Sequence, residues 1–216
     1  MVSLEWLNLS NNQLDGNIPE DLRYLPYLTV LDLSDNDLEG NIPEGLGDLY
    51  NLTELDLSDN DLNGNIPEDL GDLSQLRELD LSDNDLDGNI PENLGDLSNL
   101  TELDLSDNDL DGEIPVELVR LRNLENLYLS GNADLEGCIP VCPALSGDGC
   151  DRTIPAELGN LVNLEQLFLN DNELTGTIPA ELEDLANLDA LFLGNSDEND
   201  DDNGPDSLVA IPVQCC

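Results

Sequence analysis

The sequence predicts an α/β solenoid with a single continuous core, and three observations support this prediction. A unit of 24 residues recurs along nearly the whole chain. Each unit places leucines on alternate residues, and each continues through asparagine, glycine and Ile-Pro to a closing Leu-Gly-x-Leu. A repeat of this length indicates stacked units that share one core, so the 216 residues form one domain of about eight repeats. The repeats start at Leu4, Leu28, Leu52, Leu76, Leu100, Leu124, Leu164 and Leu188.

The first part of each unit, Leu-x-x-Leu-x-Leu, predicts a short strand. Leucines on alternate residues point to one side of a strand, toward the core, and the x residues point outward. Equivalent strands one repeat apart run in the same direction. They therefore form a parallel sheet with a spacing of ~4.8 Å between neighbouring strands.

The rest of the unit predicts a turn, a second extended piece and a tight closing turn. The asparagine ends the strand where the backbone bends inward, and we interpret it as structural because its amide both donates and accepts hydrogen bonds. The glycine, as in Gly64, suits a positive φ. We expect Ile-Pro to start the second extended piece and Leu-Gly-Asp-Leu to form a single-turn helix. The asparagines are Asn12, Asn36, Asn60, Asn84, Asn108, Asn132 and Asn172.

The repeat is interrupted in two places, and all the cysteines lie there. Repeat six contains an insertion at residues 138–153, with two Ile-Pro pairs where one belongs. Repeat eight loses its pattern after Leu193, and residues 195–216 form an irregular acidic loop and C-terminal cap. An odd number of cysteines leaves their pairing open, but a disulfide within the insertion is predicted, and it indicates an oxidising compartment. The cysteines are Cys138, Cys142, Cys150, Cys215 and Cys216.

The full motif, Leu-x-x-Leu-x-Leu-Ser-x-Asn-x-Leu-x-Gly-x-Ile-Pro-x-x-Leu-Gly-x-Leu, resembles the plant-type leucine-rich repeat over about residues 4–194. Receptor-kinase ectodomains and polygalacturonase-inhibiting proteins carry this repeat. The resemblance implies a right-handed leucine-rich-repeat solenoid, or horseshoe, with a concave parallel sheet and convex turns and 3-10 helices. It also implies an extracellular or cell-surface location and a ligand on the concave face.

The chain departs from this family at its N-terminal end. Members usually carry a disulfide-bearing cap before the first repeat, and none precedes Leu4. The first coil is therefore expected to expose leucine at its end. A homodimer through this uncapped N-terminal repeat is one way to cover it.

The charge of the chain excludes several classes of partner. The formal net charge is −45, and five arginines are the only cationic side chains. Nucleic acid binding needs a basic face that this sequence lacks. No stretch approaches the roughly 18–20 apolar residues of a membrane span, and the first residues do not resemble a signal peptide. Without histidine or a phosphate-binding loop, no catalytic constellation is visible, so we expect no enzyme.

Aspartates form three columns when repeats two to five are aligned. One column lies mid-strand and points outward, one precedes the structural asparagine, and one follows it. Neighbouring carboxylates stand ~5 Å apart and repel by about 1 kcal/mol in water. Three interpretations stay open: a salt-adapted surface, a basic protein partner, or a Ca²⁺ ladder, which is the one cofactor considered and uses the first two columns. The columns are Asp32, Asp56, Asp80 and Asp104; Asp35, Asp59, Asp83 and Asp107; and Asp37, Asp61, Asp85 and Asp109.

The mid-strand column changes from acidic to aromatic at repeat six. After Asp104 it continues as Tyr128, Phe168 and Phe192, beside the cysteine insertion. Exposed aromatic side chains stacked along a sheet are typical anchors for a partner, although cross-strand aromatic pairs also stabilise a sheet by themselves. We predict a partner-binding site at these three aromatic residues with the neighbouring Asp104 and Asp107.

The leading functional hypothesis is a non-catalytic recognition module that binds a protein or peptide, with a basic one among the candidates, on the concave face. The alternative is a structural or surface protein of a saline environment, whose acidic ladders serve solvation or cation binding. Ice binding by a regular array is disfavoured, because the repeated outward residues are charged rather than threonine.

Overall fold

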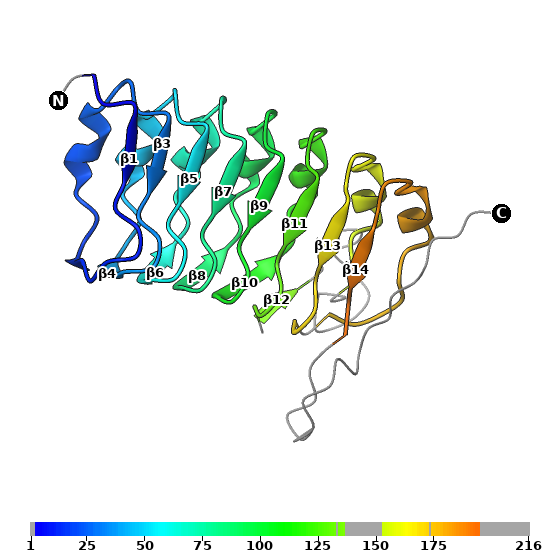
Figure 1. The fold of residues 1–216 in the computed structure, drawn as a ribbon. Coiled ribbons are helices and arrows are strands. Elements are labelled where there is room, and N and C mark those ends of the chain that lie inside the picture. The colour runs from blue at the N-terminus through cyan, green and yellow to red at the C-terminus, as the bar shows by residue number, and fades with distance from the viewer. Residues whose placement is uncertain (1–2, 133, 137–152, 173, 195–216) are drawn as a thin grey trace.

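A computed structural model describes residues 3–132, 134–136, 153–172 and 174–194 as a solenoid of stacked coils (Figure 1). One strand from each coil joins an eight-stranded parallel sheet in which every strand neighbours that of the next coil. The predicted sheet is thereby confirmed. Its strands, in order, are β1 (Trp6–Asn8), β3 (Val30–Asp32), β5 (Glu54–Asp56), β7 (Glu78–Asp80), β9 (Glu102–Asp104), β11 (Asn126–Tyr128), β13 (Gln166–Phe168) and β14 (Ala190–Phe192).

After the turn, each of the first six coils continues into a strand of a second, six-stranded parallel sheet. Ile-Pro was expected to start this extended piece, and that prediction is wrong. The strand β6, for example, ends at Asn65, and Pro67 caps the following 3-10 helix with φ −64° and ψ 131°. The strands are β2 (Asp15–Gly16), β4 (Asp37–Gly40), β6 (Asp61–Asn65), β8 (Asp85–Asn89), β10 (Asp109–Glu113) and β12 (Asp134–Glu136).

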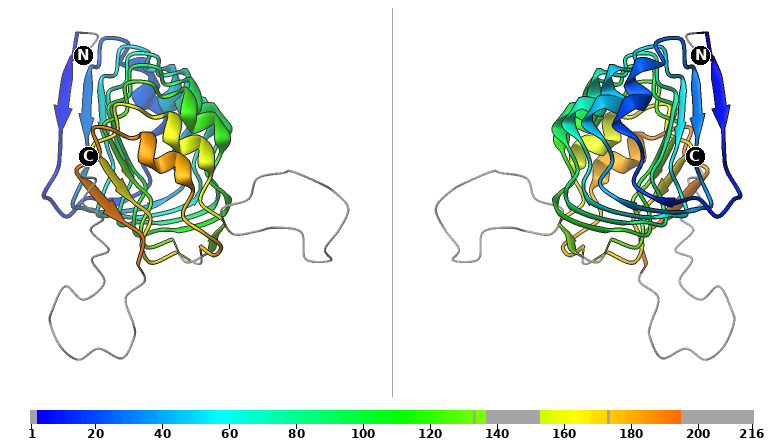
Figure 2. Two further views of the ribbon diagram at one scale, coloured as in Figure 1. Left: turned by 90° about the vertical axis from the view of Figure 1, so that its right-hand side faces the viewer. Right: turned by 90° about the vertical axis from the view of Figure 1, so that its left-hand side faces the viewer.

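The coil closes with a five-residue 3-10 helix, as Leu-Gly-Asp-Leu predicted. Viewed along the stack, the coils superpose with the eight-stranded sheet and the helices on different sides of the core (Figure 2). The helices are η1 (Glu20–Tyr24), η2 (Glu44–Asp48), η3 (Glu68–Asp72), η4 (Glu92–Asp96), η5 (Val116–Arg120), η6 (Ala156–Asn160) and η7 (Ala180–Asp184). Among the described helices, none has the length and apolar composition needed to span a bilayer.

Leucine fills most of the core, with one isoleucine from the Ile-Pro motif of each of several coils. In a central coil Leu55, Leu57 and Leu62 are fully buried, and Ile66 is 2% exposed. In repeat six the second Ile-Pro pair belongs to the regular coil, since Ile154 is buried and Pro155 caps η6. The first pair and the cysteines lie outside the described residues, as do most of the insertion at 138–153 and all of the segment at 195–216.

The regular spacing of asparagine along the chain produces a buried amide ladder at the turn between the two sheets. Asn84 donates from Nδ2 to the carbonyl oxygens of Leu81 and Ser82 in its own coil and of Leu57 in the preceding coil, at 2.9–3.2 Å. Its Oδ1 accepts the backbone N–H of Leu62 at 3.1 Å. The amide therefore satisfies polar groups of two coils at once, as its predicted structural role requires.

The first coil leaves apolar surface exposed, as predicted. Leu9 and Leu14 are each 38% exposed, whereas the equivalent Leu33 and Leu38 one coil later are 4% and 6% exposed. The strands β1 and β2 are also the outermost strands of the two sheets. Stacking of a second copy on this end stays a prediction.

Replacing Asn84 with alanine is expected to lower the free energy of unfolding by about 2–3 kcal/mol, because buried backbone groups of two coils lose their partner. Asn12→Ala is the matched control. Asn12 donates only within the first coil, to Leu9 and Ser10, so its loss is expected to be less than half as large. Urea unfolding followed by circular dichroism measures both. Equal losses would contradict the inter-coil role of the asparagine.

Candidate functional site

One face of the eight-stranded sheet points away from the core, and we call it the outer face. It is built from the first and third residues of each strand. In the inner strands the middle residue is buried and the flanking two are at least partly exposed. The register aligns these residues into two columns that cross all eight strands. The first column is Trp6, Val30, Glu54, Glu78, Glu102, Asn126, Gln166 and Ala190, and the second is Asn8, Asp32, Asp56, Asp80, Asp104, Tyr128, Phe168 and Phe192.

The three predicted aromatic residues form one row at the C-terminal end of the second column. The ring centroids of Tyr128 and Phe168 are 4.9 Å apart, and those of Phe168 and Phe192 are 4.3 Å apart, both with edge-to-face geometry. Tyr128 donates its hydroxyl to Oε1 of Gln166 at 3.0 Å. All three rings are half-buried. The row therefore stabilises itself and still presents apolar surface.

The predicted acidic partners of the row occupy two different places. Asp104 pairs in register with Tyr128 and so continues the row directly. Asp107 lies in the turn after β9, where its carboxylate reaches over Gly131 of the next coil: a Cβ on that glycine would be 2.2 Å from Oδ1 of Asp107. The predicted site thus combines four residues of the sheet face with one residue of the adjoining turn.

The first aspartate column has a structural role that the sequence analysis missed. These aspartates were placed mid-strand, but each is the last residue of its strand, and its carboxylate starts a turn. Oδ1 of Asp80 accepts the backbone N–H of Ser82 at 3.0 Å and its hydroxyl at 2.6 Å. Asp32, Asp56 and Asp104 make the same pair of contacts. The Asp-x-Ser spacing was the signal for this turn.

The second aspartate column also answers a backbone requirement. Asp35, Asp59, Asp83 and Asp107 adopt φ between 51° and 52°, a left-handed conformation that Asp, Asn and Gly tolerate best. The equivalent residues elsewhere are Asn11, Gly131 and Asp171, all with positive φ. The backbone conformation of the turn therefore explains in part which residue types occur in this column.

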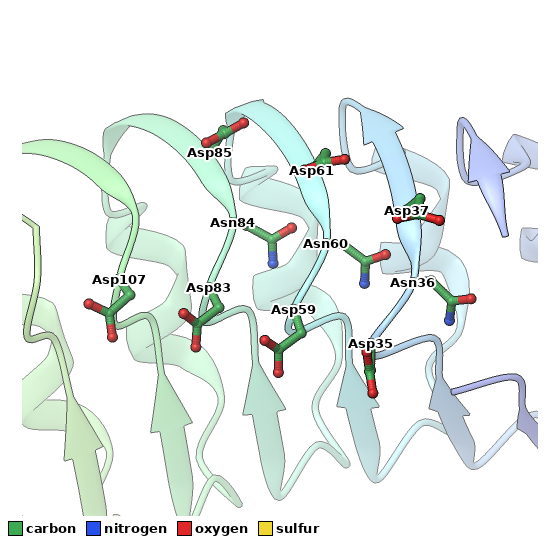
Figure 3. Close-up of a pocket in the computed structure, with 10 residues that line it drawn as sticks. All are labelled: Asp35, Asn36, Asp37, Asp59, Asn60, Asp61, Asp83, Asn84, Asp85 and Asp107. Carbon is green, nitrogen blue, oxygen red and sulfur yellow. The ribbon is translucent and has the colours of Figure 1, made fainter. Parts of the chain in front are cut away.

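The second and third aspartate columns together line an open groove of about 420 Å³ along the turns between the two sheets. Figure 3 shows two rows of carboxylates with the ladder asparagines between them. Within the described residues, no three carboxylates converge closely enough to ligate one metal ion. The groove is lined by Asp35, Asn36, Asp37, Asp59, Asn60, Asp61, Asp83, Asn84, Asp85 and Asp107.

Burial and neighbouring charges raise the pKa of several acids on the sheet face and in the groove. Desolvation raises the pKa of Asp80 to about 6; the hydrogen bonds from Ser82 oppose the rise, and the charges of Asp104 and Asp56 add to it. Desolvation is also the largest cause of the raised pKa of Asp104, Glu54 and Asp83, with neighbouring carboxylates adding to it in each case. The pKa of the Tyr128 hydroxyl rises for the same reasons.

No arginine of the described chain neutralises these acids on the sheet face. The ion pairs join Arg23 to Glu20 and Arg120 to Asp96 and Glu117, all on the 3-10 helices. A second polar groove, which the sequence did not predict, lies beside the N-terminal ends of the strands. It is lined by Arg77, Asn99, Thr101, Asn123, Glu125 and Asn163.

The raised pKa values predict that stability falls as pH rises. A carboxyl whose pKa is higher in the folded protein binds protons preferentially there, so its stabilisation is complete below its ordinary pKa and is lost as pH rises through the folded value. For Asp80 this window runs from 3.8 to about 6. We expect the urea midpoint to fall as pH rises from about 4 to about 6 at constant ionic strength. Asp80→Asn should flatten the curve, and a midpoint that rises with pH would contradict the prediction.

The fold and the repeat match known proteins over most of the chain. The sequence model of a family described as "Leucine-rich repeat region" matches residues 52–211, and that of "Leucine Rich Repeat" matches residues 3–25 and 27–49. A comparison with curated proteins gave no match.

Several solved structures are similar to this chain. The plant peptide hormone receptor RGFR1, in complex with RGF2, is 36% identical with a TM-score of 0.81, over 90% of this chain and 29% of the receptor. The Arabidopsis receptor kinase HAESA, in complex with the peptide hormone IDA and the co-receptor SERK1, is 35% identical with a TM-score of 0.78, over 90% of this chain and 31% of that one. The Leptospira interrogans leucine-rich-repeat protein LIC12759 is 34% identical with a TM-score of 0.72, over 89% and 43%.

The chain thus spans less than half the length of each of these three proteins. The match extends over both the strand motif and the Ile-Pro motif of the repeat, and the structure shows the coils that these motifs encode. This chain belongs to the leucine-rich-repeat family, with the repeat of plant receptor-kinase ectodomains.

Proposed function

We propose that this chain is a non-catalytic recognition module that binds a protein or peptide on the outer face of the eight-stranded sheet, which is the face that the sequence predicts to be concave. The contact surface consists of Tyr128, Phe168 and Phe192 with the neighbouring Asp104 and Asp107. The observation that carries the proposal is the row of three half-buried rings, in register across β11, β13 and β14. Apolar surface concentrated on one face of a highly charged protein is typical of an interface.

The similar structures support this class of function. RGFR1 is in complex with RGF2, and HAESA is in complex with a peptide hormone and a co-receptor. Receptor ectodomains of this kind also support a location outside the cell or at its surface. A protein or peptide partner and an extracellular setting are therefore our proposals for this chain.

The aromatic row would stabilise the sheet even without a partner, so that role has to be weighed. Each edge-to-face pair contributes about 0.5–1.5 kcal/mol beyond the area that it buries. Burying the same area between aliphatic side chains would stabilise the strands without leaving rings half open to water. The neighbouring residues of the first column at β11 and β13 are Asn126 and Gln166, whose amides suit contact with a peptide backbone.

We expect Phe168→Ala/Phe192→Ala to weaken partner binding at least about tenfold, as loss of an aromatic anchor does. Peptides selected from a random display library on the wild-type protein serve as probes, and fluorescence anisotropy measures their affinity. Tyr27→Ala/Tyr50→Ala is the matched control, since it removes two aromatic residues that are 57% and 59% exposed outside the strands. Circular dichroism checks that each variant is folded. The site would be refuted by peptides that bind Phe168→Ala/Phe192→Ala as tightly as they bind Tyr27→Ala/Tyr50→Ala.

The acidic groove favours a second candidate, a surface stabilised by dissolved salt. Its carboxylates line an open channel rather than a closed cage, and hydrated counterions suffice to screen such exposed charges.

For this second candidate we expect NaCl, MgCl₂ and CaCl₂ to raise the melting temperature equally at matched ionic strength. The physical reason is that screening depends on ionic strength and not on the identity of the cation. Calorimetry or circular dichroism measures the shift. A larger shift with CaCl₂ alone would contradict generic screening and support a specific calcium ladder on the first two aspartate columns.

A further inference from the structure

The outer face of the eight-stranded sheet is divided by strand into chemically distinct bands. β1 and β3 carry Trp6 and Val30 in the first column. β5, β7 and β9 carry glutamate in the first column and aspartate in the second. β11, β13 and β14 carry the aromatic row. We call the six carboxylates of the middle strands the acidic band: Glu54, Asp56, Glu78, Asp80, Glu102 and Asp104.

The negative charge of the three aspartates in this band is not required by the turn that they start. In the first coil Asn8 occupies the position of these aspartates, and its Oδ1 accepts the N–H and the hydroxyl of Ser10 at 3.1 and 2.9 Å. A neutral amide therefore makes the turn that Asp80 makes. The charge at this position adds repulsion without adding a structural contact, so it calls for an explanation outside the backbone.

The charges of the band are also left uncompensated by the described part of the chain. Every ion pair described there lies on the 3-10 helices. Within the band, burial and neighbouring charges raise the pKa of Glu54, Asp80 and Asp104. A partner that brings a positive side chain to this face would relieve that cost.

The acidic band and the aromatic row are directly adjacent. Asp104 and Tyr128 are register partners, and Asn126 donates to Oε2 of Glu102 at 3.1 Å across the same boundary. From β7, at the centre of the band, to β13, at the centre of the row, there are three strand spacings. This span is ~14 Å, which about four residues of an extended chain cover at ~3.3 Å per residue.

We propose that the occupant of this face is an extended peptide segment that crosses the strands, with an arginine or lysine over the acidic band and an apolar side chain on the aromatic row about four residues away. This inference rests on the proposed function and adds the chemistry and spacing of the partner. Charge complementarity with the acidic band favours a cationic side chain, and the aromatic row favours an apolar one. Phosphate-bearing partners do not fit, because neither column of this face contains a cationic side chain.

The test uses the peptides selected by display on the wild-type protein. Those that lose affinity on Phe168→Ala/Phe192→Ala are sequenced, and the expected result is enrichment of Arg or Lys about four residues from an aromatic or aliphatic residue. A synthetic copy of the tightest peptide is then compared with two derivatives. Replacing its cation by glutamine is expected to weaken binding at least about tenfold, and so is moving the cation next to the apolar residue.

Two protein variants with the same change of net charge separate a local contact from general attraction to an acidic protein. Glu78→Gln/Glu102→Gln neutralises two carboxylates of the band. Glu68→Gln/Glu92→Gln neutralises the first residues of η3 and η4, on a different side of the coil. Glu78→Gln/Glu102→Gln is expected to weaken binding of the synthetic peptide about tenfold, and Glu68→Gln/Glu92→Gln less than twofold.

The outcomes distinguish this inference from the function on which it rests. Peptides that need the two phenylalanines but carry no cation, or that bind Glu78→Gln/Glu102→Gln like wild type, overturn the inference and leave the proposed function standing. Peptides indifferent to the two phenylalanines overturn both. A selection that yields no binding peptide also overturns both.

Discussion

The stacking of each coil on the next is the constraint on which the rest of this structure depends. A single coil is too thin to satisfy its own backbone, so its strand N–H and C=O groups bond to the coils on either side, as Leu57 does to Asp80. The asparagine ladder extends this dependence into the turn, because the amide of Asn84 serves the coil before it as well as its own. Inward positions are thereby restricted to leucine, isoleucine and asparagine, and variation is left to outward ones.

The same constraint explains much of the acidity. Asp59 occupies a turn position with φ 52°, and Asp56 starts that turn by accepting two hydrogen bonds from Ser58. In the acidic coils the first position supplies an acceptor oxygen and the second tolerates a left-handed backbone. Asn8 and Asn11 meet these needs without charge in the first coil. The backbone thus accounts for the kind of side chain, and the choice of acid over amide remains the part that concerns salt or a partner.

Recognition chemistry arises where the repeat changes while its geometry is kept. The register that aligns Asp104 with Asp80 also aligns Tyr128 with Asp104, so a change of side chain in three coils produces a continuous aromatic row. The acid column in the turn is interrupted at the same coil, where Gly131 replaces aspartate and leaves room for the carboxylate of Asp107, and aspartate returns at Asp171. The change of residue type between β9 and β11 therefore creates a boundary between a charged and an apolar surface.

The sequence by itself determined the coil, the parallel sheet, the buried asparagines and the grouping of Tyr128, Phe168 and Phe192, because a fixed period assigns every residue the same place in each coil. It did not determine the place of the second strand, which ends before Ile-Pro, or the roles of the aspartates, which depend on a φ of 52° and on contacts with Ser82 and its equivalents. These were decided by the tertiary structure. A side chain's backbone conformation, burial and neighbours in the next coil exist only once the coils are stacked, and they separate a carboxylate that builds a turn from one that is left for a partner.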